Sequence, residues 1–97
     1  MRTMLTVSIP VDTGNKAIKD GSLPKIMEGF MQRFKPESAY FFAADGLRTA
    51  QFVFDLSDAT DIPSVAEPFF MGLDAEISAT PVMNADDLRK GLEKLIK

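Results

Sequence analysis

The stretch from Ser38 to Leu56, SAYFFAADGLRTAQFVFDL, has apolar residues on both faces of what must be a hairpin. Asp45-Gly46 predicts a two-residue turn, because both residues tolerate positive φ. Side chains alternate between the faces of a strand. One face collects Ala39, Phe41, Ala43, Ala50, Phe52, Phe54 and Leu56, and the other collects Tyr40, Phe42, Thr49, Gln51, Val53 and Asp55. A single layer of helices covers only one face, so the second face requires another cover.

The turn also fixes which residues face each other across the hairpin. The expected cross-strand pairs are Ala44 with Leu47, Phe42 with Thr49, Tyr40 with Gln51 and Ser38 with Val53. Period-two alternation predicts two further strands, over residues 4–9 (MLTVSI) and 74–82 (DAEISATPV).

The first helical region lies between the first strand and the hairpin. Turn-forming residues from Asp12 to Gly14 predict a turn after Pro10, followed by a short helical stretch at 15–20 that ends at Gly21. Apolar residues at helical spacing then predict a helix over 22–34, with Ser22 as its cap.

Two more helices follow the hairpin. One begins after residues 58–61, with Thr60 or Asp61 as its cap, and Gly72 is expected to end it. Pro68 lacks an amide hydrogen, so we expect this helix to bend or restart there. The other covers residues 84–97 and is capped by Asn84.

This order of elements predicts an α+β, ferredoxin-like βαββαβ domain over residues 1–97: a four-stranded antiparallel sheet with two helices on one face, followed by a C-terminal helix. The helices should cover Leu5, Val7, Ile9, Phe41, Phe52, Phe54 and Ile77. The opposite face would carry Met4, Thr6, Ser8, Tyr40, Phe42, Gln51, Val53, Asp55, Glu76, Ser78 and Thr80.

The apolar part of this second face favours association with a second copy. Removing exposed aromatic rings such as Phe42 from water is favourable and promotes association. We therefore expect a homodimer with its sheets face to face and a barrel-like space between them. The alternative is an open sheet whose polar residues are simply hydrated.

Composition removes many chemistries. The 97-residue chain contains no Cys and no His, which excludes disulfides, thiol nucleophiles, zinc fingers and histidine-based triads. A net charge of −3 with scattered Lys and Arg argues against nucleic acid. No segment approaches the ~20 apolar residues of a membrane span. We expect a cytoplasmic protein without a metal or a cofactor.

The segment from Pro68 to Ile77, PFFMGLDAEI, resembles the helix-to-strand junction of muconolactone isomerases. The shared features are a proline, an apolar and aromatic pair, an apolar residue before an aspartate, and a glutamate in the strand. Together with the order of elements, the chain resembles the dimeric α+β barrel superfamily, which includes small cofactor-free monooxygenases of antibiotic biosynthesis. The resemblance implies the fold and the dimer, and no catalytic role is carried over.

Three residues of the second sheet face are candidates for catalysis. Asp55 and Glu76 would face a partly apolar space, which is expected to raise their pKa values. Tyr40, beside Gln51, could orient a carbonyl or a phenol. Candidate ligand-binding residues on the same face are Thr6, Ser8, Gln51, Phe42, Ser78 and Thr80.

Three functions are compatible with these residues. The first is a homodimer that binds a small molecule between its sheets. The second is a cofactor-free isomerase or monooxygenase, which requires Asp55, Glu76 or Tyr40 to converge on one pocket. The third is a structural or interaction module.

Two further features have open roles. Arg48, after the turn, could bind an anion or a neighbouring subunit, or be solvated. The terminal helix could pack on its own subunit or reach across the dimer.

Overall fold

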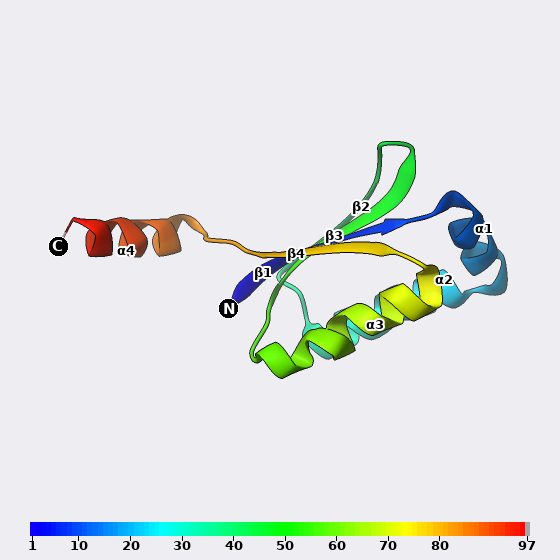
Figure 1. The fold of residues 1–97 in the computed structure, drawn as a ribbon, viewed down its shortest axis with the longest axis horizontal. Coiled ribbons are helices and arrows are strands. Elements are labelled where there is room, and N and C mark those ends of the chain that lie inside the picture. Colours follow the sequence, from blue (N-terminus) through cyan, green and yellow to red (C-terminus); the bar gives the residue numbers. More distant parts are fainter. Residues whose placement is uncertain (97) are drawn as a thin grey trace.

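The computed structural model describes residues 1–96 as one sheet, three helices beside it and one helix that projects away (Figure 1). The elements, in chain order, are β1 (Arg2–Ile9), α1 (Val11–Asp20), α2 (Ser22–Phe34), β2 (Ser38–Ala44), β3 (Leu47–Asp55), the 3₁₀ turn η1 (Ala59–Asp61), α3 (Ile62–Leu73), β4 (Glu76–Pro81) and α4 (Ala85–Leu95). The strands are ordered β2-β3-β1-β4, and all neighbours are antiparallel. This α+β arrangement is compatible with the predicted ferredoxin-like fold.

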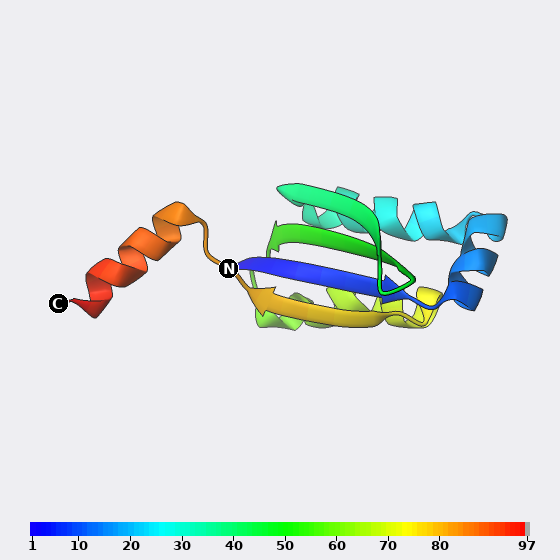
Figure 2. The same ribbon diagram turned by 90° about the horizontal axis from the view of Figure 1, so that it is seen from above.

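The helices are distributed unevenly around the sheet. Helices α2 and α3 lie against one face, and α1 lies at one end of the sheet (Figure 1). Figure 2, turned by 90°, looks onto the face of the sheet that α2 and α3 do not cover, with the strands in front of these helices, and shows α4 extending beyond the other end. None of the helices within residues 1–96 has the length and apolar character needed to cross a membrane.

The predicted hairpin register is confirmed. Asp45 and Gly46 adopt φ values of 53° and 77°, as a turn with two left-handed residues requires. The expected cross-strand pairs all form, with Tyr40 opposite Gln51 and Phe42 opposite Thr49. Every side chain of the hairpin therefore lies on its predicted face.

The hydrophobic core lies between the sheet and the α2 and α3 layer. Leu5, Val7 and Phe52 are fully buried. The Phe30 ring of α2 lies 4.6 Å from the Phe52 ring, and an aromatic cluster of this kind stabilises the contact beyond area burial alone.

The expected burial of Phe41 is wrong, because its side chain is 56% exposed. β2 is an edge strand, and the ring meets the fully buried Phe52 edge-on, with 5.8 Å between the ring centroids.

The first helical region differs from its prediction. Helix α1 begins at Val11, so residues 12–14 form its first turn of helix and not a separate turn. Gly14 is buried, and a Cβ atom there would lie 2.6 Å from Nη1 of Arg48. The glycine therefore permits close packing against Arg48 here, although its residue type suggested a turn.

Helix ends follow the prediction in part. Gly21 ends α1 in the left-handed conformation (φ 79°), as predicted. Ser22 makes no side-chain cap; instead its backbone amide donates to Asp20 Oδ1 (2.8 Å). Asn84 caps α4 as predicted, in a reciprocal capping box with Asp87.

Helix α3 continues through Pro68 and ends after Leu73, where Asp74 adopts φ 50°. The helix therefore does not restart at Pro68, and it ends one residue after the expected Gly72. Pro68 is on the exposed side of the helix, where water can satisfy the carbonyl that lacks a partner. Neither Thr60 nor Asp61 caps α3 with its side chain; Asp58 caps the preceding turn through the Thr60 amide.

Candidate functional site

The sheet face opposite α2 and α3, called the open face here, presents cross-strand rows of side chains. The central row contains Tyr40, Gln51, Thr6 and Ser78, one residue from each strand. The two adjacent rows contain Phe42, Thr49, Ser8 and Glu76 on one side, and Ser38, Val53, Met4 and Thr80 on the other. All six predicted ligand-binding residues therefore lie in three consecutive rows.

The central row, called the polar row, supplies an amide and three hydroxyl groups. Gln51 Nε2 donates a hydrogen bond to Thr6 Oγ1 at 3.4 Å, which orients the amide along the row. Strands in a sheet are ~4.8 Å apart, so the row spans about 14 Å. Amide and hydroxyl groups both donate and accept hydrogen bonds, so the row could bind a carbonyl or hydroxyl group of a small molecule.

One large aromatic side chain belongs to the polar row, and another lies in the adjacent row. Tyr40 is 66% exposed and Phe42 is 44% exposed. Met4 and Val53, in the row on the other side, are half-buried by their strand neighbours. Exposed apolar side chains gathered on one face are typical of contact and ligand surfaces.

The predicted carboxylates do not lie together. Asp55 is opposite Arg2 at one end of β1, and Glu76 is opposite Ser8 near the other end. Six residues of strand separate them, about 20 Å at ~3.3 Å per residue. Within one chain, Tyr40 lies in the row between them, so the three candidate catalytic residues do not converge.

The predicted raised pKa of Asp55 is wrong. The amino group of Met1 donates to Asp55 Oδ1 at 2.6 Å, and the Ser57 hydroxyl donates to Oδ2 at 3.2 Å. These hydrogen bonds stabilise the ionised carboxylate and lower the pKa of Asp55 below its ordinary value. The side chain is exposed at the end of the sheet, where the apolar surroundings assumed from the sequence are absent.

Arg2 organises the same end of the sheet. Its guanidinium donates to Glu37 Oε1 at 2.7 Å and also to the Asp87 carboxylate. The hydrogen bond to Glu37 is the main cause of a raised pKa for Arg2. Glu37, Asp55 and Asp87 line an open cavity at this end of the sheet, and each of them is paired within the chain. We interpret the cluster as a structural link between β1, the start of β2 and α4.

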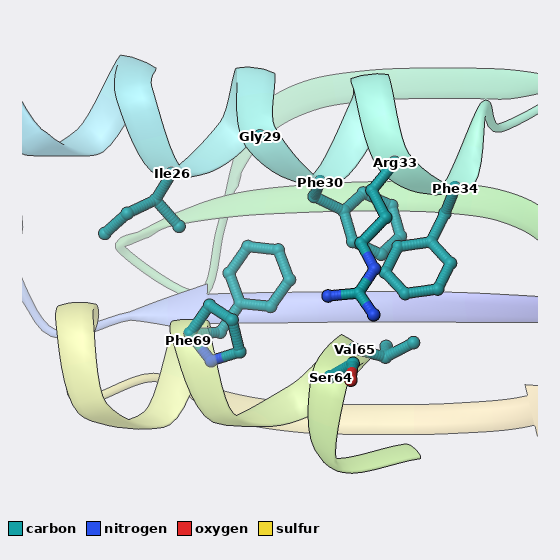
Figure 3. A pocket seen from close by; sticks show the side chains of 9 residues that line it. Ile26, Gly29, Phe30, Arg33, Phe34, Ser64, Val65 and Phe69 are labelled. Carbon is teal, nitrogen blue, oxygen red and sulfur yellow. The ribbon is translucent and has the colours of Figure 1, made fainter. Parts of the chain in front are cut away.

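A pocket lies between α2 and α3, on the helix-covered side of the sheet (Figure 3). Phe30 and Phe69 form apolar walls, and Arg33 extends across the pocket with its guanidinium 5.4 Å from the centroid of the Phe34 ring. The pocket measures about 200 Å³. Typical small-molecule sites measure ~300–1,000 Å³, so this pocket is smaller than a typical ligand site.

Arg48 has a structural contact. Its guanidinium donates to Asn15 Oδ1 at 3.0 Å and to the Val11 carbonyl at 3.4 Å. It thus connects the start of β3 to α1. The sequence offered no signal for this contact, because residues 12–14 were expected to form a turn and not the start of a helix.

The comparisons with known proteins add no relationship: no protein-family model matches this chain, and no curated protein matches its sequence. The resemblance of the Pro68 to Ile77 segment to muconolactone isomerases therefore stays a prediction. The functional argument depends on the geometry of the open face.

Proposed function

We propose that two copies of the chain pack through their open faces and bind a small organic molecule between the two sheets. The observation that carries this proposal is the polar row, in which Gln51 is hydrogen-bonded to Thr6 and Tyr40 is exposed, with exposed Phe42 in the next row. A second sheet would remove these rings from water. It would also enclose hydroxyl and amide groups that then require a partner, which a ligand can supply.

The charges of the open face define the class of ligand. Among the residues of the three central rows, Glu76 alone carries a charge, and it lies on the edge strand β4. A neutral molecule with an aromatic or apolar body and a carbonyl or hydroxyl group fits this surface. The apolar body would lie against Phe42, and the polar group would reach Gln51 and Thr6.

Catalysis is not part of this proposal. The isomerase or monooxygenase alternative requires Asp55, Glu76 or Tyr40 to meet, and within one chain the two carboxylates lie at opposite ends of β1. Small-molecule binding requires only the residues of the polar row and the rings beside it.

Mass spectrometry of the purified native protein tests the proposal. We expect wild-type dimers to retain a small organic molecule, and we expect Gln51→Ala to lose it because the ligand then lacks its amide partner. Gln32→Ala is the matched control, since Gln32 is exposed on α2, in the helix layer. A wild-type dimer that retains no molecule, or equal retention by both variants, would refute the assigned site.

A further inference from the structure

Helix α4 is held in a direction that points away from its own subunit. The Val82 amide donates to the Arg2 carbonyl at 3.0 Å, and the Arg2 side chain binds Asp87 in the first turn of α4. The capping box of Asn84 and Asp87 orders the same turn. Figures 1 and 2 show α4 continuing beyond the end of the sheet, on the side opposite α1.

The apolar side of α4 has no cover within residues 1–96. Leu88, Leu92 and Leu95 follow each other at helical spacing and are 47%, 50% and 76% exposed. No residue of α4 belongs to the described hydrophobic core. Isolated helices shorter than ~12–15 residues are marginal in water, so an 11-residue amphipathic helix is expected to pack against another surface.

A fitting surface exists beside the edge strand β4. An apolar groove of about 210 Å³, called the β4–α3 groove here, has walls that include Ile62, Ala66, Phe70, Ile77 and Ala79. Ile62 and Phe70 are 51% and 43% exposed. The groove thus leaves large apolar side chains in water on the helix side of the sheet.

The charges of the two surfaces are complementary. No Lys or Arg occurs between Arg48 and Arg89, so β4 and α3 have only acidic charges, with Asp61 and Glu67 on or beside α3. The last turns of α4 carry Arg89 and Lys94 together with one acid, Glu93, and Arg89 also pairs with Asp86 of the same helix. Lys90 lies on the side of α4 away from the leucines. Opposite charges at the rim of an apolar contact favour encounter and fix its orientation.

We infer that α4 of one copy docks in the β4–α3 groove of a second copy of this chain. Docking in its own groove would require the chain to reverse at Val82, Met83 and Asn84, which would break the contact between Arg2 and Asp87. Docking on another copy keeps the observed direction of α4. This contact uses the helix side of the sheet and is separate from the proposed open-face contact.

Cysteine cross-linking tests the inference, because the chain contains no natural Cys. Leu92→Cys places a thiol on the apolar side of α4, and Ala66→Cys places one in the groove. Mixing the two single variants under mild oxidation should give a disulfide-linked dimer. Lys90→Cys, on the charged side of α4, is the matched control and should not link to Ala66→Cys.

Each other result overturns the inference. A link that forms only within one chain of the Leu92→Cys/Ala66→Cys double variant would show that α4 folds back on its own groove. Absence of any link, or equal linking by Lys90→Cys, would exclude the groove. A third outcome would assign α4 to a lipid surface instead. In that case no disulfide link forms, the wild-type chain co-sediments with anionic phospholipid vesicles, and Leu92→Ser abolishes the co-sedimentation. Ligand retention does not enter this assay, so the open-face proposal can fail separately.

Discussion

Substituting Phe42 by Ser should weaken the proposed open-face dimer by a measurable amount. A Phe side chain presents roughly 200 Å² to water, and Phe42 is 44% exposed, which leaves about 90 Å² for a partner to cover. At ~25 cal/mol per Å², this area contributes about 2 kcal/mol per chain, and a symmetric dimer buries it twice. The expected loss is about 4 kcal/mol, or ~10³-fold in the dimer dissociation constant.

Sedimentation velocity over a concentration series measures this constant. Circular dichroism should show a folded variant, because Phe42 is outside the core of the single chain. Met71→Ser is the control: Met71 is 76% exposed on α3, in the helix layer, and its loss should leave the dissociation constant unchanged. A wild-type chain that stays monomeric at high concentration, or equal constants for the wild type and Phe42→Ser, would refute the reasoning.

Further predictions concern the stability of the fold. Gly21→Ala should lower the free energy of unfolding in denaturant by about 1–2 kcal/mol, because Gly21 has φ 79°. Gly29→Ala within α2 should raise the free energy of unfolding by about 0.5–1 kcal/mol, since a Cβ atom there contacts nothing within 4 Å. Hydrogen bonds from the Thr60 amide and hydroxyl lower the pKa of Asp58 in the folded chain. The ionised Asp58 therefore stabilises the fold above its unfolded pKa of ~3.9, and this stabilisation is lost as pH falls through the lower pKa of the folded state. Thermal melting should therefore show Asp58→Ala less stable than the wild type near neutral pH and equal to it in strong acid. Asn84→Ala removes an N-cap worth ~1 kcal/mol, and hydrogen exchange of the α4 amides should accelerate.

The sequence predicted the register of the hairpin because its turn has a local cause. The two-residue turn requires positive φ, which Asp45 and Gly46 tolerate, and with two turn residues the register of every later pair follows. The polar row could also have been recognised in advance, since the register and strand order together place Thr6 beside Gln51.

The rest depends on contacts that are distant in sequence. Gly14 was interpreted as a turn residue, but the Arg48 side chain that packs over it comes from the hairpin. The pKa of Asp55 depends on the amino group of Met1, which is 54 residues away in sequence. Residue type alone indicates neither contact.

The absence of α4 side chains from the core has a consequence for how the chain can change. The sheet, α1, α2 and α3 are complete before Val82. Truncation after Pro81 should therefore leave an independently folding domain that lacks α4. Folding and the proposed α4 contact would then be encoded in separate stretches of the gene. Mutations could retune the second without a penalty to the first.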